Sequence, residues 1–230
     1  MNICIIPARG GSKRIPRKNI RLFHGKPMIS WAIEKALSSQ CFDKIIVSTD
    51  DAEIAATAIE SGAEVPFLRP TELSDDYTST QVVIQHAINS VPSIHLDSFL
   101  CCLYPTVPFL VPADINKCFD LLATNSYARY SFPATSFSYP VQRSLLIDST
   151  GICRMSNPEN YLIRSQDLVE HYHDSGQFYL ALAKTWLEPE NIFHRSLPLI
   201  IPRWRVHDLD TPEDWQRAEL FFPLFQSEYS

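Results

Sequence analysis

Long apolar runs are missing from this sequence of 230 residues. No stretch approaches the roughly 18 consecutive apolar residues that a membrane-spanning helix needs. The apolar N-terminus, residues 1–6, breaks off at Pro7 and lacks the basic flank of a signal peptide. We therefore expect a cytoplasmic protein that works without a membrane.

A surplus of basic charge is also missing, since 20 Lys and Arg residues face 26 Asp and Glu residues, giving a net charge of −6. Proteins that bind duplex nucleic acid usually present a net basic surface, so we do not expect a nucleic-acid partner. The hydrophobic share of 45% and the charged share of 20% are ordinary for a globular protein with a sizeable core. The length fits one domain, or one domain that carries a smaller subdomain.

The six cysteines form no C-x-x-C pair. Cys101 and Cys102 are adjacent in an apolar run, where their side chains would point to opposite faces of a strand. We expect buried, reduced thiols, because free cysteine is among the most buried residue types. The six residues are Cys4, Cys41, Cys101, Cys102, Cys118 and Cys153.

Internal repeats, low-complexity tracts and charged tails are missing too, and what is present is an alternation of two patterns. Short apolar runs, typical of buried strands, occupy 2–6, 44–48, 64–68 and 98–104. Segments with helical period or helix-start signals occupy 27–39, 52–61, 78–91 and 112–125. This alternation predicts an α/β fold in which a mostly parallel sheet is covered by helices on both faces.

The pattern loosens from about 130 to 174, where turn residues and aromatics follow no clear period. We expect an inserted arm or lobe there, within a single domain that spans 1–230. Late strands are expected at 177–183 and 198–201. Thr211 then caps a final helix, with Pro212 at its first position and an acid at its third.

A basic turn directly follows the first expected strand: five of the 20 basic residues lie between Arg9 and Lys18. Ligands of open α/β sheets bind beyond the carboxyl ends of the strands, where this turn should lie. Gly10 and Gly11 would let the backbone approach an anion closely, and the Lys and Arg side chains can neutralise a polyphosphate. Neither a P-loop nor a dinucleotide-binding G-x-G-x-x-G is present, and a solvated basic loop is the alternative interpretation.

Two carboxylates, Asp208 and Asp210, stand just before the final helix. In an extended segment the side chains at i and i+2 face the same way. Such a pair suits Mg²⁺, which is usually held by one or two acids together with phosphate oxygens and waters. Acids that simply favour a helix start are the alternative.

Several short motifs, in order along nearly the whole chain, resemble those of the acylneuraminate cytidylyltransferase family. They are the turn at 8–13 with Pro16 and 18–19, followed by 47–50, 69–76, 104–108 and 208–214. This family activates sialic acids and their bacterial relatives with CTP. The resemblance implies a Rossmann-like nucleotidyltransferase fold with an inserted lobe that forms a homodimer. The implied reaction transfers CMP from CTP to the anomeric hydroxyl of a nine-carbon acidic sugar and releases pyrophosphate.

The resemblance also assigns roles at the nucleotide end of the site. Arg9 and Lys13 would hold the triphosphate and stabilise charge on the departing pyrophosphate, while Arg69 and Thr80 would lie near cytosine. The alternatives are a solvated head for Arg69 and a first-turn helix position for Thr80, with Thr78 as the cap. The nucleotide-binding set is Ala8, Arg9, Gly10, Gly11, Ser12, Lys13, Lys18, Asn19, Arg69 and Thr80, and the catalytic set is Arg9, Lys13, Asp208 and Asp210.

By the same resemblance Asp208 and Asp210 are the metal ligands and Mg²⁺ is the cofactor. The metal would bridge phosphate oxygens and lower the pKa of the attacking hydroxyl. No side chain is assigned as the general base, and a metal-linked carboxylate or water is our interpretation.

The sugar end departs from the sialic-acid branch of the family. That branch usually has Gln-Pro-Thr-Ser-Pro and Arg-Pro-Asn-Gly segments, where this chain has Tyr104 and the run from His173 and Asp174 to Gly176. Both departures resemble the pseudaminic acid branch, whose sugar has two acetamido groups and a deoxygenated tip. Arg164, with the basic turn as a further candidate, would then meet the sugar carboxylate. A packing role for the Tyr and a local His–Asp hydrogen bond are the alternatives.

Other functions stay open at this point. The same chemistry on N-acetylneuraminic, legionaminic or deoxyoctulosonic acid is the nearest alternative. A glycosyltransferase has a D-x-D and a similar sheet but does not need the basic cluster, because it expels no pyrophosphate. A non-catalytic nucleotide-binding protein would not need Lys13, Asp208 and Asp210 together.

Overall fold

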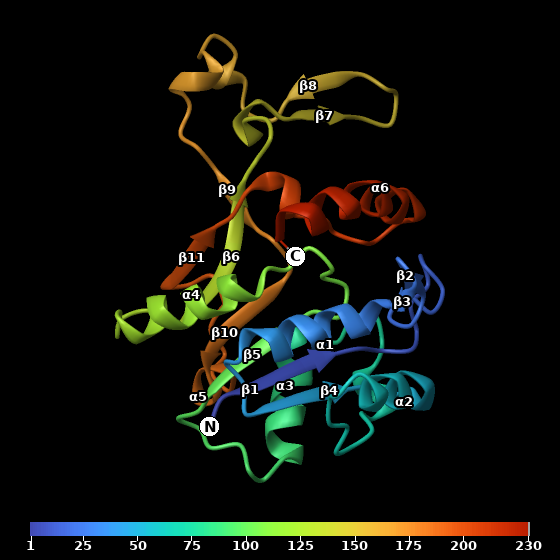
Figure 1. The fold of residues 1–230 in the computed structure, drawn as a ribbon. Helices are drawn as coiled ribbons and strands as arrows, with labels where there is room; N and C mark the ends of the chain where they lie inside the picture. Colours follow the sequence, from blue (N-terminus) through green and yellow to red (C-terminus); the bar gives the residue numbers. More distant parts are fainter. Residues whose placement is uncertain (230) are drawn as a thin grey trace.

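A mixed sheet runs through the centre of the protein in a computed structural model that describes residues 1–229 (Figure 1). The strand order is β11-β6-β10-β5-β1-β4, with β9 paired to β6. The strands are β1 (Ile3–Pro7), β4 (Lys44–Ser48), β5 (Phe99–Leu103), β6 (Tyr130–Ser136), β9 (Tyr172–Asp174), β10 (Phe178–Leu182) and β11 (Ser196–Ile200).

Most of these strands run in one direction, as predicted. β1 pairs in parallel with β4 and β5, and β11 pairs in parallel with β6. Only β9 and β10, of the strands in this sheet, run the other way: β10 is antiparallel to β5 and β6, and β9 to β6. The reversal arises because the chain returns from the lobe after β6 through β9 and β10, without the crossover helix that parallel neighbours need.

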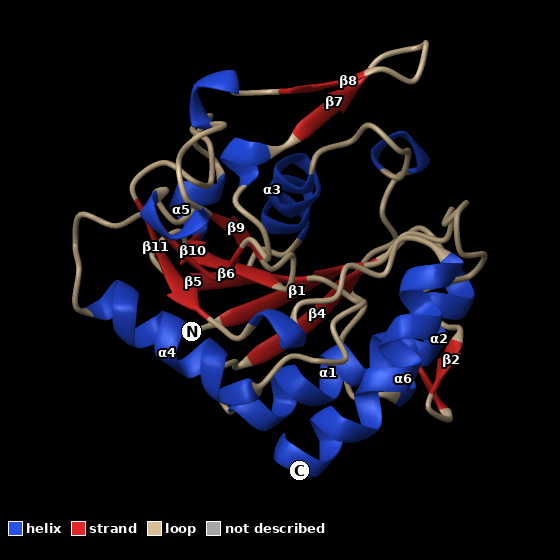
Figure 2. Cartoon of the chain, turned by 90° about the horizontal axis from the view of Figure 1, so that it is seen from above, coloured by secondary structure: helices blue, strands red, loops and turns tan. Residues whose placement is uncertain are grey.

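Helices cover both faces of the sheet (Figure 2). α1 (Met28–Ser39), α2 (Ala52–Glu60) and α4 (Pro112–Ala123) bury their apolar stripes in one core cluster, which also contains Cys101. α3 (Thr80–Ser90) and the short α5 (Ala183–Trp186) pack in the cluster on the other face, which contains Cys102. The two adjacent thiols therefore point to opposite faces, as predicted.

A third cluster joins the last helix, α6 (Pro212–Tyr229), to the first half of the chain. Trp215, Phe222 and Phe225 of α6 pack against α1 and against the small hairpin of β2 (Leu22–Phe23) and β3 (Lys26–Pro27). The helix begins with the expected reciprocal cap. Asp214 accepts from the N–H of Thr211 at 2.8 Å, and the Thr211 hydroxyl accepts from the N–H of Asp214 at 3.2 Å.

Two local predictions differ from the structure. Residues 64–68 form only isolated bridges, Ile46 to Glu64 and Thr49 to Leu68. Pro66 lies between them and has no N–H to donate to a ladder. The cap of α3 is Ser79, whose hydroxyl accepts from the N–H of Val82, rather than Thr78.

The projecting lobe is shorter than the expected segment 130–174. β6 and β9, at its two ends, belong to the central sheet, so residues 137–171 are the part that projects (Figure 1). The lobe contains the hairpin of β7 (Leu145–Ile147) and β8 (Cys153–Met155) and three short 3₁₀ helices, η2 (Val141–Arg143), η3 (Pro158–Asn160) and η4 (Ser165–Asp167). The aromatic and polar mixture of 130–136 concealed a strand because nearly every residue in it is buried.

All six cysteines in the described chain are free. Four are buried as expected, whereas Cys41 is half-buried and Cys153 is exposed on β8 of the lobe. The lobe has little core of its own, which explains the exposure of Cys153. No helix within residues 1–229 combines the length and apolarity needed to cross a bilayer.

Candidate active site

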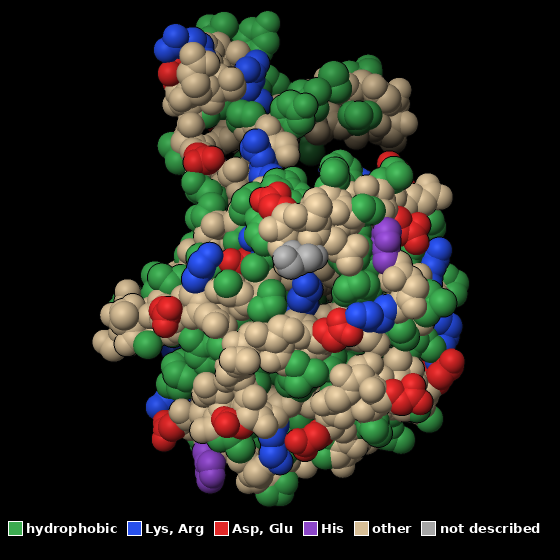
Figure 3. Space-filling model, in the orientation of Figure 1, with side chains coloured by type: hydrophobic (Ala, Val, Ile, Leu, Met, Phe, Trp, Pro, Cys, Tyr) green, Lys and Arg blue, Asp and Glu red, His purple; other side chains and the backbone are tan. Residues whose placement is uncertain are grey.

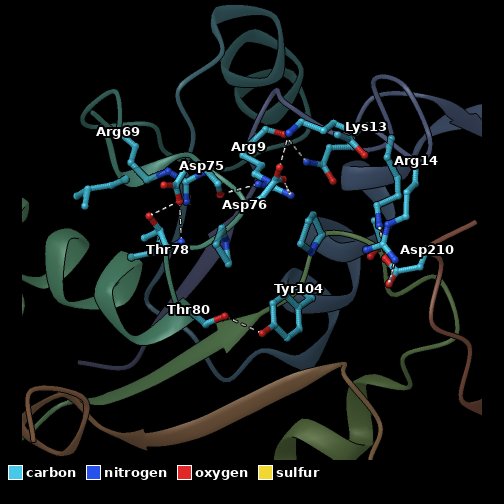
Figure 4. Close-up of a pocket in the computed structure, with 18 residues that line it drawn as sticks. Arg9, Lys13, Arg14, Arg69, Asp75, Asp76, Thr78, Thr80, Tyr104 and Asp210 are labelled. Carbon is cyan, nitrogen blue, oxygen red and sulfur yellow. Dashed lines mark hydrogen bonds and ion pairs between the residues drawn. The ribbon is translucent and has the colours of Figure 1, made fainter. Parts of the chain in front are cut away.

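A cavity of about 520 Å³ lies beyond the carboxyl ends of β1 and β5, between the basic turn and the segment 69–80 (Figure 4). Arg9, Ser12, Lys13, Lys18 and Asn19 line it from the basic turn. Arg69, Thr80 and Tyr104 line it from the opposite side. The structure therefore brings most of the predicted nucleotide-binding residues together.

The remaining members of that set shape the turn from behind. Ala8 is fully buried and its N–H donates to the carbonyl of Ser48 at 2.9 Å. The N–H of Gly10 donates to Asp50 Oδ1 at 2.9 Å, and a Cβ at Gly10 would lie 2.6 Å from Asp51 Oδ2. A side chain at position 10 would force the carboxylate of Asp51, which follows β4, to shift.

Gly11 and Asn19 have different roles in the same turn. A Cβ at Gly11 would meet no described heavy atom within 4 Å, so this glycine has no steric requirement in the described chain. Asn19 is buried, and its side-chain amide donates to the carbonyl of Arg9 at 2.9 Å. Asn19 thus holds the turn closed beneath the cavity while it also lines it.

Asp76 holds the two cations that were assigned to the triphosphate. Its carboxylate lies 2.7 Å from Arg9 Nη2 and 2.5 Å from Lys13 Nζ. Hydrogen bonds from Lys13 and then Arg9 lower the pKa of Asp76 below its usual value. Sequence analysis did not single out Asp76, although it lies within the family motif at 69–76.

Arg69 lies beneath the cavity with only 3% of its side chain exposed, so the solvated-head alternative is wrong. Its Nε donates to the hydroxyl of Ser74 at 3.0 Å, and Nη2 is 4.0 Å from Asp50 Oδ1. Burial lowers the pKa of Arg69, although Asp50 opposes that effect. A buried, charge-balanced guanidinium has a fixed orientation and suits recognition of a planar polar group.

A second cavity of about 580 Å³ adjoins the first, and Lys18, Tyr104, Thr106 and Asp210 line both. His173 and Asp174 line the second cavity, as the sugar-end assignment expects. The local hydrogen bond of His173 goes from Nδ1 to the backbone carbonyl of Asp174, at 2.8 Å.

The carboxylate of Asp174 is held instead by Tyr179, which donates to its Oδ2. Tyr179 lines the second cavity from β10 and was not predicted. Burial, followed by the hydrogen bond to Asp174, raises the pKa of Tyr179. Burial also raises the pKa of Tyr104 to about 12, so both tyrosines are neutral hydroxyl donors near neutral pH.

Asp208 and Asp210 both line the second cavity, with Leu209 buried between them. Asp210 is 2.9 Å from Arg14 Nη1 and 3.3 Å from Lys18 Nζ. Burial, followed by the negative charge of Asp210, raises the pKa of the Asp208 carboxyl above its usual value. This like-charge pair beside a polyphosphate-sized cavity provides the hard oxygen donors that Mg²⁺ prefers.

Few protein side chains are available at this site as metal ligands. Within residues 1–229 no group of three or more His, Cys, Asp or Glu side chains is placed to hold a metal ion. Asp208 and Asp210 therefore fit an ion that takes its remaining ligands from phosphate and water, as Mg²⁺ does, and do not fit a closed all-protein site.

Arg164 lines neither cavity of the described chain, and unlike Ala8, Gly10 and Gly11 it does not belong to the basic turn. It lies in the lobe, next to η4, and its Nε is 2.6 Å from Asp167 Oδ2. Within the described chain it therefore does not contribute to the wall of the second cavity.

Known proteins resemble this chain over nearly its whole length. Residues 3–175 match the model of the cytidylyltransferase family. The chain is 44% identical over 226 residues to the pseudaminic acid cytidylyltransferase of Campylobacter jejuni, and the match covers 97% of both proteins. It is 35% identical over 237 residues to the CMP-N,N'-diacetyllegionaminic acid synthase of Legionella pneumophila, again over 97% of both.

A solved structure has the same fold. It is CMP:2-keto-3-deoxy-manno-octonic acid synthetase complexed with CTP, with a TM-score of 0.70 over 97% of this chain and 99% of that one. At 16% identity this likeness shows the fold alone. The Rossmann-like nucleotidyltransferase fold expected from the sequence is thereby confirmed. By its family match and by its near full-length relatives, the chain belongs to the cytidylyltransferase family.

Proposed function

We propose that this chain transfers CMP from CTP to pseudaminic acid and releases pyrophosphate. The observation that carries the proposal is the pair of adjoining cavities, which share Lys18, Tyr104 and Asp210 as a common wall. The cationic turn makes the first cavity suitable for a triphosphate, and the second has room for an acidic sugar. The 44% identity to a pseudaminic acid cytidylyltransferase supports this sugar, compared with 35% for the legionaminic acid enzyme.

The chemistry is a displacement at phosphorus. The anomeric hydroxyl oxygen of the sugar loses its proton to water and forms a bond to the α-phosphorus of CTP, while the bond from that phosphorus to the bridging oxygen breaks and pyrophosphate leaves with that oxygen. Such a transfer needs positioning and charge neutralisation more than covalent catalysis. Arg9 and Lys13 supply the positive charge for the departing pyrophosphate, which takes the place of the Asp76 carboxylate between them.

We assign Asp208 and Asp210 as the residues that hold Mg²⁺. Bound there, Mg²⁺ supplies charge stabilisation at the phosphate oxygens and lowers the pKa of the attacking hydroxyl. Lys18 orients this carboxylate pair, because its ammonium group donates to the carbonyl of Leu209 at 2.6 Å and lies beside Asp210. Together with Arg14, it also opposes the rise in the pKa of Asp208, which burial and then the charge of Asp210 cause.

Sugar recognition is assigned to the second cavity. Tyr104 presents a mostly apolar ring where the sialic-acid branch has a Gln, which suits a deoxygenated sugar. Asp174 uses Oδ2 to accept from Tyr179, so Oδ1 is left to accept from the amide N–H of an acetamido group. His173 shapes the wall beside it, with its ring packed against Phe137 at 4.8 Å between centroids.

The lobe is assigned as the interface of a homodimer. Large apolar side chains gather on it (Figure 3), among them Leu145, Ile147 and Leu162 with exposed fractions of 59%, 72% and 87%. Apolar surface of this kind is typical of a protein–protein contact. In such a dimer Arg164 would serve the sugar site of the partner subunit, which accounts for its distance from both cavities in its own chain.

Product analysis tests the proposed function. The purified protein is incubated with CTP, Mg²⁺ and pseudaminic acid, and the products are identified by ³¹P NMR and mass spectrometry. CMP-pseudaminic acid is the expected product, formed with a higher kcat/KM than the CMP adducts of N-acetylneuraminic, legionaminic or deoxyoctulosonic acid. A higher kcat/KM with any of those three would overturn the sugar assignment. The cytoplasmic location stays a prediction, which cell fractionation would check.

A further inference from the structure

The segment that bears the two carboxylates has no backbone ladder to hold it. Residues 206–210 belong to no strand or helix of the described chain. Downstream the segment is tied to the start of α6, where the Asp214 carboxylate accepts from the N–H of Asp210 at 3.3 Å. Across the cavity it is tied by Lys18 to the carbonyl of Leu209. Within the segment, Leu209 is buried in the third core cluster and the ring of His207 stacks on Phe109 at 4.1 Å between centroids. The position of its upstream end also depends on what precedes residue 206.

Arg205 is the upstream anchor. It ends the short 3₁₀ helix η5 (Arg203–Arg205) and is 4% exposed. Its guanidinium pairs with Asp114 in the first turn of α4, and Asp114 is 2% exposed. The carbonyl of Arg205 accepts from the side-chain amide of the buried Gln177, at 3.1 Å. The residue is thus fixed by side chain to one helix and by backbone to the approach of β10.

The ring of Tyr229, at the far end of α6, lies 5.1 Å from the guanidinium carbon of Arg205. Residues 205–210 and α6 therefore form one unit, and its first and last residues, Arg205 and Tyr229, meet at the Arg205 guanidinium. A shift of Arg205 would move the upstream end of the carboxylate segment relative to the sheet, because no strand pairing in the described chain holds that end.

Folding stability does not account for a pair of this kind. Removing two charges from water costs about as much as their attraction returns, and an apolar pair of similar volume is often equally stable. The buried Nε of Arg205 also has no hydrogen-bond partner in the described chain, which adds to the cost. What the pair does provide is a fixed distance and direction between α4 and the segment.

We propose that the buried ion pair of Arg205 and Asp114 is a positioning element that places Asp208 and Asp210 for metal and triphosphate. This inference rests on the metal assignment made above. Neither Arg205 nor Asp114 lines either cavity of the described chain, so both act through the carboxylates. Loss of groups that touch metal ligands typically weakens metal binding by about 10- to 100-fold, and because this pair acts through the backbone of 206–210 we expect the lower end of that range.

The decisive variant replaces both charges at once, Arg205→Met with Asp114→Leu, so that no buried charge is left unpaired. The thermal unfolding midpoint is expected to stay close to that of the wild type. The dissociation constant of Mn²⁺ in the presence of CTP, measured by electron paramagnetic resonance, is expected to rise by about tenfold or more. The Mg²⁺ concentration for half-maximal turnover is expected to rise with it.

A matched control separates positioning from a general loss of a buried arginine. Arg129 is 13% exposed and pairs with Glu188 and Glu190, outside both cavities. Arg129→Met is expected to leave Mn²⁺ binding unchanged. If the double variant binds Mn²⁺ as tightly as the wild type does, the proposal is overturned.

Arg205→Lys keeps the charge but loses the fork of donors, and it covers the case in which the double variant does not fold. It is expected to fold and to bind Mn²⁺ several-fold more weakly, about 2- to 10-fold; wild-type affinity would overturn the proposal. Failure of the metal assignment itself has a different signature, visible in the wild type alone. A wild-type protein that binds no Mn²⁺ with CTP and turns over fully in EDTA would overturn both assignments.

Discussion

The hydroxyl groups of Thr80 and Tyr104 lie 2.8 Å apart and hydrogen-bond to each other across the floor of the first cavity. Thr80 opens α3 and Tyr104 directly follows β5, so the bond links two elements far apart in the chain. The sequence assigned one residue to cytosine and the other to the sugar. Under the proposed assignments, their contact connects the nucleotide and sugar ends of the site through one pair of side chains (Figure 4).

Tyr104→Phe is expected to raise the KM of both CTP and the sugar by a few-fold each, with a smaller effect on kcat. The lost hydrogen bond leaves the Thr80 hydroxyl free to turn, at a cost of about 1 kcal/mol in folding free energy. Steady-state kinetics with each substrate varied in turn checks this. Tyr130→Phe is the control, since its buried hydroxyl donates to the carbonyl of Thr185 at 3.2 Å away from the site. An equal KM change in both variants would show that no coupling exists.

Gly10→Ala and Gly11→Ala form a matched pair in the basic turn. The new methyl group at Gly10 would lie 2.6 Å from Asp51 Oδ2, whereas at Gly11 it meets nothing described within 4 Å. Gly10→Ala is therefore expected to lower the unfolding free energy by about 1–3 kcal/mol and to weaken CTP binding. Gly11→Ala should change stability by less than about 0.5 kcal/mol. Chemical denaturation and calorimetric titration with CTP measure both effects, and equal behaviour of the two variants would refute the steric argument.

Lys13→Ala and Asp210→Ala are each expected to abolish turnover while the fold stays intact. The Lys13 side chain is 80% exposed and that of Asp210 is 32% exposed, so neither carries the core. Circular dichroism and pyrophosphate release measure the two properties separately. Lys184→Ala is the control, because Lys184 forms a comparable surface ion pair with Asp97 at 2.7 Å. A variant of Lys13 or Asp210 that unfolds, or that retains full activity, contradicts the assignment.

Asp51 should make the stability depend on pH. A hydrogen bond from Arg17 is the main reason that its folded-state pKa lies below the ordinary value, and the N–H of Ile54 adds to it. A depressed pKa stabilises the fold above the unfolded-state value of about 3.9, and this contribution is lost as the pH falls through the folded-state value.

The corresponding test is Asp51→Asn, which keeps a good helix cap for α2 but removes the charge. The variant is expected to be less stable than the wild type near neutral pH, and the gap should close well below pH 3.9. Urea denaturation at both pH values measures it. A gap that stays constant would show that the charge of Asp51 contributes nothing.

The sequence predicts the fold well where each pattern has one physical cause. The buried runs at β1, β4 and β5 and the apolar stripes of α1 and α4 lie where they were expected. The prediction failed at 64–68 because Pro66 interrupts the run, and propensity alone gave too little weight to its missing N–H. The boundary of the lobe at β6 was missed because that strand is buried on both faces and so has no alternation.

The candidate site residues also differ in whether the sequence alone marks them. Arg9 and Lys13 stood out in the sequence because of the charge cluster, whereas Asp208 and Asp210 were assigned through the family resemblance, and both assignments stay predictions. Tyr179 was not predictable, because it acts as one residue of a regular strand and nothing local distinguishes it. The roles of Asp76 and Arg205 depend on partners 63 to 91 positions away, which only the folded chain brings into contact.

Pyrophosphate release from CTP, measured with each nonulosonic acid in turn and with or without EDTA, tests the central claim most directly. The account predicts release that requires the divalent metal and that is fastest with pseudaminic acid. Release with N-acetylneuraminic acid only would keep the enzyme class and contradict the roles given to Tyr104 and Asp174. No release with any of these sugars would contradict the proposed reaction itself.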